Sequence, residues 1–164
     1  MKDALNRPPL LDRIKWHKDC VRHWLNRKLF NPKTPAITDE EQLARFVLFS
    51  KHVVALDQRI KPDAFIPHPY PDLSVTRHLD LSDQQVWKCG SAIATMRKRT
   101  LYGRADLSAA IVRQQSLEIE PAPIEGNPNH ANIFRWPADK PSQKIIAQQL
   151  AAASAYRSYA AKTP

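Results

Sequence analysis

Two histidines and one arginine stand at the ends of segments that have the pattern of strands. His52 ends one apolar segment, Arg77 ends the segment DLSVTR at 72–77, and His130 opens a third segment after the sequence NPN. If these strand ends converge, one imidazole can act as general base and the other as general acid. The guanidinium would stabilise the charged transition state of a phosphodiester. The catalytic residues of such a metal-independent enzyme, acting on RNA or a nucleotide, would be His130, Arg77 and His52.

The alternative for these residues is a structural role. Single histidines at strand ends are commonly hydrogen-bonded or solvated, and spacing along the chain does not show that the strand ends meet. For Arg77 we favour contact with a phosphate or a partner, and for His78 simple exposure at the strand terminus.

The sequence disfavours metal and cysteine chemistry. His17, Cys20 and His23 are three residues apart on one predicted helix, but a zinc site usually draws on a second sequence-local pair of ligands, and no such pair is present. Cys20 and Cys89 are far apart, so a reducing compartment is a simpler interpretation than a disulfide framework. We therefore expect no metal and no cofactor.

Charge is the strongest global signal. Lysine and arginine number 25 against 16 aspartate and glutamate residues, which gives a formal net charge of +9. A surface with this excess attracts polyanions, and nucleic acid, whether RNA or DNA, is the common one. A partner protein with an acidic face is the alternative.

Two segments concentrate the positive charge. Residues 10–30 have helical periodicity, and the polar face of that helix is basic. A second patch spans 96–104, where MRKRT would end one helix and GRAD would precede another at 107–115, a position that suits an anion. The expected nucleic-acid-binding residues are Arg13, Lys15, Lys18, Arg22, Arg27, Lys28, Arg97, Lys98, Arg99 and Arg104.

The elements that must position these residues alternate between helical and strand periods. The sequence TDEE at 38–41 has the form of a capping box, so residues 42–56 could be helical throughout, but the continuous apolar run within them favours a strand around 45–54. Ser82 and Gln85 form a second capping box, which opens a helix reaching about Arg99. Further strands are expected at 72–77, from 101 up to a short helix at 107–115, at 117–121 and at 130–136, and a last helix is expected at 139–162.

This order predicts the α+β class, with one small mixed or antiparallel sheet, helices on one side of it, and a basic N-terminal helix. We expect residues 1–37 to form the basic helix and a proline-rich connector, and residues 38–164 to form a single α+β domain. No stretch approaches the ~18 apolar residues of a membrane span, and the first residues lack the apolar core of a signal peptide. We expect a cytoplasmic protein without membrane association.

Part of the chain resembles a loose group of small uncharacterised bacterial proteins. The resemblance rests on Leu-Ser-Val-x-Arg at 73–77, Gly-x-Ala at 103–105 and Asn-Pro-x-His-Ala-x-Ile at 127–133, and it covers residues 43–153. The group is similar to proteins encoded in mobile or defence-type gene clusters, so the resemblance implies a link to antiphage defence. It carries no known activity.

Three functions follow as hypotheses. The first is a nucleic-acid-associated component of a bacterial multi-protein system for antiphage defence, with nucleic acid or proteins of the same operon as partners. The second is the metal-independent enzyme described above. The third is a protein adaptor that docks through the basic helix at 10–30, which carries Trp16 and Trp24.

Overall fold

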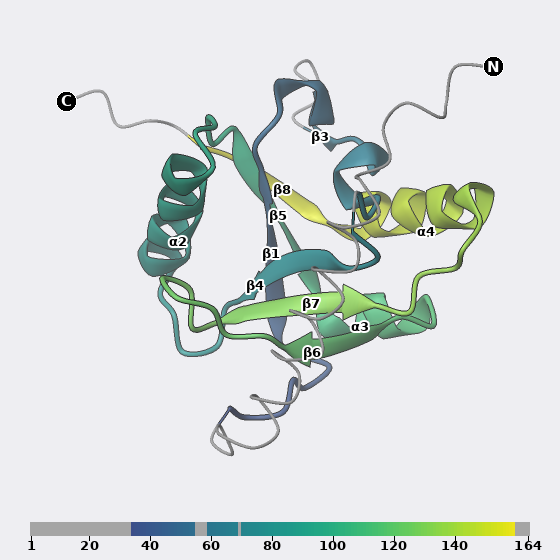
Figure 1. Cartoon of the computed structure of the whole chain (residues 1–164), viewed down its shortest axis with the longest axis horizontal. Coiled ribbons are helices and arrows are strands. Elements are labelled where there is room, and N and C mark those ends of the chain that lie inside the picture. The colour runs from purple at the N-terminus through teal and green to yellow at the C-terminus, as the bar shows by residue number, and fades with distance from the viewer. Residues whose placement is uncertain (1–33, 55–58, 69, 160–164) are drawn as a thin grey trace, which may run out of the picture. The chain divides into compact units, whose positions relative to one another are not determined.

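The computed structural model describes residues 34–54, 59–68 and 70–159 (Figure 1). The predicted basic helix at 10–30 lies outside the described residues, and so do six of the expected nucleic-acid contacts: Arg13, Lys15, Lys18, Arg22, Arg27 and Lys28. The described residues from Ile37 onward belong to one structural unit.

A six-stranded antiparallel sheet forms the centre of this unit, with the strand order β6-β7-β4-β1-β5-β8. Figure 1 shows β4, β7 and β6 turned away from the direction of β1 and β5. The strands are β1 (Gln42–Val47), β4 (Leu73–Arg77), β5 (Gly103–Ser108), β6 (Glu118–Pro121), β7 (His130–Phe134) and β8 (Ala155–Ser158).

One face of this sheet carries the larger core. The register sets Leu43 of β1 opposite Leu107 of β5, and Leu73 of β4 opposite Ile133 of β7. All four side chains are buried in one apolar cluster, because residues that lie opposite each other on paired strands point to the same face. The cover of this face comes from α3 (Ala109–Gln114), α4 (Lys140–Ala153) and the 3₁₀ helix η2 (Pro62–Phe65).

The helix α2 (Asp83–Met96) packs on the opposite face. It approaches Phe46 of β1 at Gly90, where a Cβ atom would lie 2.6 Å from Cε1 of the phenyl ring. The predicted capping box opens this helix: the Ser82 N–H donates to Oε1 of Gln85 at 2.8 Å, and the Gln85 N–H donates to Oγ of Ser82 at 3.3 Å. That prediction is confirmed.

The predicted α+β class with one antiparallel main sheet is also confirmed, although helices cover both faces of the sheet and not one. The strand expected around 45–54 is interrupted. Instead β1 ends at Val47, the 3₁₀ helix η1 (Ser50–His52) follows, and a separate two-stranded sheet pairs β2 (Val53–Val54) with β3 (Arg59–Ile60).

Two boundaries differ for reasons that lie outside the local sequence. The TDEE sequence opens no helix, because Glu41, which would have completed the cap, binds Arg77 of β4. The last helix ends at Ala153, and the residues after it form the edge strand β8. Gly103 of β5 permits this pairing, since a Cβ there would lie 2.5 Å from the Arg157 carbonyl oxygen.

Candidate functional site

The main sheet splits between its two central strands. β1 pairs with β5 along six residues, but it pairs with β4 only through Leu43 with Arg77 and Ala44 with Thr76. Both strands continue beyond these pairs, so they diverge at Arg45. The Arg45 side chain bridges the gap: Nε donates to the Ala64 carbonyl and Nη1 donates to the Ser74 carbonyl, each at 2.9 Å.

A pocket lies beside this split, and we call it the basic pocket. Its lining comes from β1, η1, β4, the C-terminal end of α2 and the segment that leads into β7. Four basic side chains reach it, namely Arg45, His52, Arg97 and His130, and none of its lining residues is an aspartate or a glutamate. A pocket lined in this way has a positive potential.

The two guanidinium groups of the basic pocket are not neutralised within the described part of the chain. Neither Arg45 nor Arg97 has a carboxylate within the 4.0 Å of an ion pair. Burial, and then the positive charge of Arg97, lower the pKa of Arg45 to about 10. Arg45 therefore stays protonated at neutral pH, and an anion bound beside it would offset the cost of its burial.

The two histidines of the pocket are held differently. Nδ1 of His130 lies 2.7 Å from the Ala122 carbonyl oxygen. A carbonyl oxygen only accepts, so Nδ1 carries the hydrogen, and Nε2 is the basic nitrogen of the neutral ring. The pKa of His52 is lowered, chiefly by burial and then by the nearby charges of Lys51 and Arg45, so its imidazole is neutral at pH 7.

Three of the residues that line the pocket are large apolar side chains exposed to solvent. Phe49, Met96 and Ile124 all line the pocket, and their exposed fractions are 41%, 65% and 36%. We call these three residues the apolar rim. Two cations lie over the Phe49 ring, with Arg99 Cζ at 4.9 Å and Lys51 Nζ at 5.8 Å from its centroid.

The structure thus brings together two of the three residues expected at a catalytic site. His52 and His130 line the same pocket, as the hypothesis of a metal-independent enzyme required. Arg77 does not. Its side chain is 1% exposed and binds Glu41 through two hydrogen bonds, Nε to Oε1 at 2.5 Å and Nη2 to Oε2 at 2.8 Å. The arginine that lines the pocket is Arg45.

The basic patch expected at 96–104 also contains both exposed and buried cations. Arg97, Lys98 and Arg99 are exposed at the C-terminal end of α2, where Arg97 lines the basic pocket and Arg99 covers Phe49. Arg104 is fully buried, so the expectation that it binds nucleic acid is wrong. The expected helix N-terminus at 107 is also absent, since residues 103–108 form β5 and α3 begins at Ala109.

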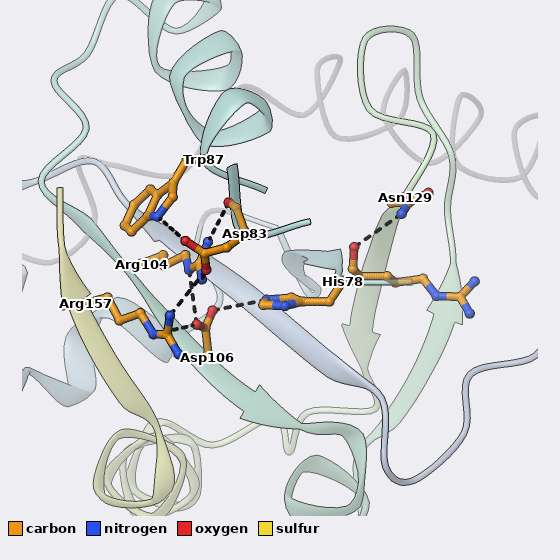
Figure 2. A network of polar contacts seen from close by, with 8 residues as sticks. His78, Asp83, Trp87, Arg104, Asp106, Asn129 and Arg157 are labelled. Atoms are coloured by element: carbon orange, nitrogen blue, oxygen red, sulfur yellow. Dashed lines mark hydrogen bonds and ion pairs between the residues drawn. The ribbon is translucent and has the colours of Figure 1, made fainter. Parts of the chain in front are cut away.

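Arg104 belongs to a polar network that is satisfied internally (Figure 2). Its Nε donates to Oδ2 of Asp106 at 3.1 Å, its Nη2 pairs with Asp83, and its guanidinium lies 4.4 Å from the centroid of the Trp87 ring. Arg157 of β8 reaches both carboxylates, at 3.2 Å from Asp83 and 3.5 Å from Asp106. The network ties the start of α2 to β5 and to the edge strand.

His78 is not simply exposed, because it joins the same network. Its Nε2 lies 3.2 Å from Oδ1 of Asp106, and a carboxylate only accepts, so Nε2 carries the hydrogen (Figure 2). The hydrogen bond from Arg104 lowers the pKa of Asp83 below its ordinary value. Asp83 and Asp106 already neutralise the cations of this network, so the network offers no unpaired positive charge to bind an anion. We therefore place the candidate site at the basic pocket.

The NPNH sequence positions His130 rather than acting chemically itself. Asn127 is buried and donates to Oγ1 of Thr76 at 2.8 Å, while Asn129 donates to the Leu79 carbonyl at 2.9 Å and its own carbonyl accepts from the Arg77 N–H at 2.8 Å. These bonds fasten the turn to β4. The strand register then sets His130 beside Thr76, at the pocket.

Arg45 and Phe49 were missed by the sequence reasoning. The available signal was a single arginine inside the apolar run LARFVLF, since a guanidinium in a buried strand needs polar partners or a ligand.

Other chemistry finds less support. Among residues 34–54, 59–68 and 70–159, no three histidine, cysteine or carboxylate side chains gather closely enough to hold a metal ion. Burial raises the pKa of the Cys89 thiol, which keeps it protonated and weakly nucleophilic at neutral pH. None of the helices in the described segments has the length and apolar composition needed to cross a membrane.

The comparisons with known proteins add no family. No protein-family model matches the chain, and no curated protein or solved structure matches it significantly.

Proposed function

We propose that this protein binds nucleic acid, with a backbone phosphate held in the basic pocket. The observation that carries the proposal is the pocket itself: two guanidinium groups and two imidazoles around a lining without any carboxylate. Arginine suits phosphate because its planar fork can donate two parallel hydrogen bonds to one anion. The net charge of +9 favours the same kind of partner over longer distances.

The surroundings of the pocket favour a polymer over a small anion. Lys51 and Arg99 are exposed and lie over the ring of Phe49, which lines the pocket, so neighbouring phosphates of a chain would meet further cations. The wider role as a component of a bacterial defence system rests on the sequence resemblance, and it forms part of the proposal on that ground alone.

The test is equilibrium binding of fluorescein-labelled oligonucleotides at low salt, where release of counterions favours association most. We expect the chain to bind, and we expect Arg97→Glu to weaken binding strongly. Lys144→Glu is the matched control, because Lys144 is an exposed cation on α4, which does not line the pocket. Absence of binding at low salt would refute the proposal.

A second function, metal-independent cleavage of RNA, is favoured by one specific observation: His52 and His130 line the same pocket as Arg45. In this reaction Nε2 of His130 accepts the proton of a ribose 2′-hydroxyl, and the 2′-oxygen attacks the phosphorus. The bond from phosphorus to the 5′-oxygen breaks, and protonated His52 gives its proton to that oxygen. The products are a cyclic 2′,3′-phosphate and a free 5′-hydroxyl, while Arg45 stabilises the charge on the phosphoryl oxygens.

The reaction needs a protonated His52, although the pKa of His52 is lowered. An imidazole with a low pKa is rarely protonated at pH 7, so the bound phosphate must restore its proton by favouring the charged form. Cleavage should therefore show a bell-shaped dependence on pH and persist in the presence of a chelator. His130→Ala and His52→Ala should each abolish it, and because the His130 ring also binds the Ala122 carbonyl, activity is compared at a temperature at which thermal melting shows both variants to be folded. Activity that survives both substitutions would exclude this function.

A further inference from the structure

The apolar rim indicates what kind of nucleic acid the pocket takes. Phe49 precedes η1, Met96 ends α2, and Ile124 lies in the segment that leads into β7, so three separate parts of the fold present large apolar side chains at one mouth. Burying such side chains inside would be favourable, and apolar groups that stay exposed together beside charged residues commonly mark a binding site.

The environment of Phe49 narrows the chemistry of the ligand. The His52 ring lies 5.3 Å from the Phe49 ring, tilted by 55°, and the cations of Arg99 and Lys51 lie over the phenyl ring. An aromatic ring that carries cations over its face and lines the basic pocket complements a molecule that has a flat π-system joined to an anion. A nucleotide unit has this form, with its base on the rim and its phosphate in the pocket.

We propose that the apolar rim seats an unpaired base, so that the ligand of the basic pocket is single-stranded nucleic acid. This inference rests on the proposed function. In a duplex the base faces are stacked inside and only backbone and groove edges are offered, so a duplex could use the cations but not the rim. In a single strand every base has a free face, and the stacking tolerates different base sequences.

An acidic segment of a protein is the competing occupant. It would satisfy the cations of the pocket, but carboxylate side chains bring no flat surface to the rim. The structure therefore favours nucleic acid over an acidic peptide. Loss of the Phe49 ring should weaken the binding of a nucleic-acid strand and leave the binding of an acidic peptide unchanged.

The experiment compares four ligands at one fixed salt concentration by fluorescence anisotropy: oligo(dT), oligo(U), a duplex of the same length, and poly-glutamate as a competitor. Phe49→Leu removes the aromatic ring and keeps an apolar side chain at the rim. Tyr70→Leu is the matched control, because Tyr70 is also an aromatic residue that is half exposed, and it does not line the pocket.

We expect the unmodified chain to prefer the single strands, and Phe49→Leu to weaken their binding by about 5- to 150-fold while leaving duplex binding unchanged. Tyr70→Leu should change neither. Met96→Gln gives an independent test at an exposed helix end in case Phe49→Leu lowers the melting temperature, and it should also weaken single-strand binding alone.

The outcomes separate the two proposals. Equal affinity for single strand and duplex, or no effect of both rim substitutions, would overturn this inference and leave nucleic-acid binding intact. Competition by poly-glutamate as strong as by oligo(dT) would overturn it in favour of an acidic protein partner. Absence of binding to all polynucleotides at low salt would instead refute the proposed function itself.

Discussion

The salt dependence of polynucleotide binding gives the sharpest prediction, because the number of cations around the basic pocket sets its magnitude. Four permanently charged side chains are available for phosphates, namely Arg45, Arg97, Arg99 and Lys51. For a single strand, the logarithm of the binding constant falls with the logarithm of salt by ~0.7 per neutralised phosphate, so four contacts give a slope of about −2.8. The double variant Arg97→Ala/Arg99→Ala should reduce the slope to about −1.4.

These slopes translate into a clear difference in affinity. Between about 50 and 200 mM salt, the unmodified chain should lose roughly 50-fold in affinity and the double variant roughly 7-fold. The assay is fluorescence anisotropy with oligo(dT) over a salt series. The matched control is Lys140→Ala/Lys144→Ala, which removes the same charge from α4.

The refuting result is equally clear. If the control lowers the slope as much as the double variant does, binding follows overall charge and not the basic pocket. If neither changes the slope, the cations around the pocket do not meet phosphates. Thermal melting of both variants checks that the fold is intact, since Arg97 is the C-cap residue of α2.

Two further predictions concern the polar network of Figure 2. Arg104→Met should lower the free energy of unfolding by about 3 kcal/mol, because it leaves the buried Asp106 with weaker partners, and it should leave the salt slope of oligo(dT) binding unchanged. Urea unfolding measures the first effect, and a normal stability combined with weak binding would restore Arg104 as a nucleic-acid contact. Asp83→Asn should be less stable than the unmodified chain above about pH 4, because the lowered pKa of Asp83 stabilises the folded state only while its carboxylate is charged. That difference should shrink as the pH falls through the lowered pKa, and a difference that stays constant from neutral to strongly acid pH would show that the charge of Asp83 does not matter.

Much of the fold could be predicted because its signals are local. The strand patterns of DLSVTR and LEIEP predicted β4 and β6, and the residue types Ser82 and Gln85, spaced as in a capping box, predicted the start of α2. The predictions failed where the conformation of a segment depends on a residue far away in the sequence. Glu41 had the sequence of a helix cap but pairs with Arg77, which lies 36 residues further on.

The candidate site was predictable only in part for the same reason. His52 and His130 were singled out by their positions at the ends of apolar segments, and both do reach one pocket. Arg77 and Arg104 are arginines that the sequence alone could equally assign to a phosphate contact. In the structure each is buried and paired with a carboxylate. Nothing in the spacing of residues distinguishes an arginine that has such partners from one that has none.

The sequence by itself determined the class of this protein and the sign of its charge, because periodicity and composition are properties of the chain at short range. The tertiary structure alone decided which positive charges remain available to bind an anion. Ion pairs with carboxylates neutralise Arg77 and Arg104, whereas the divergence of β1 from β4 leaves Arg45 beside a pocket without a carboxylate. Charge compensation depends on distances of a few ångströms between residues far apart in the chain, and only folding sets those distances.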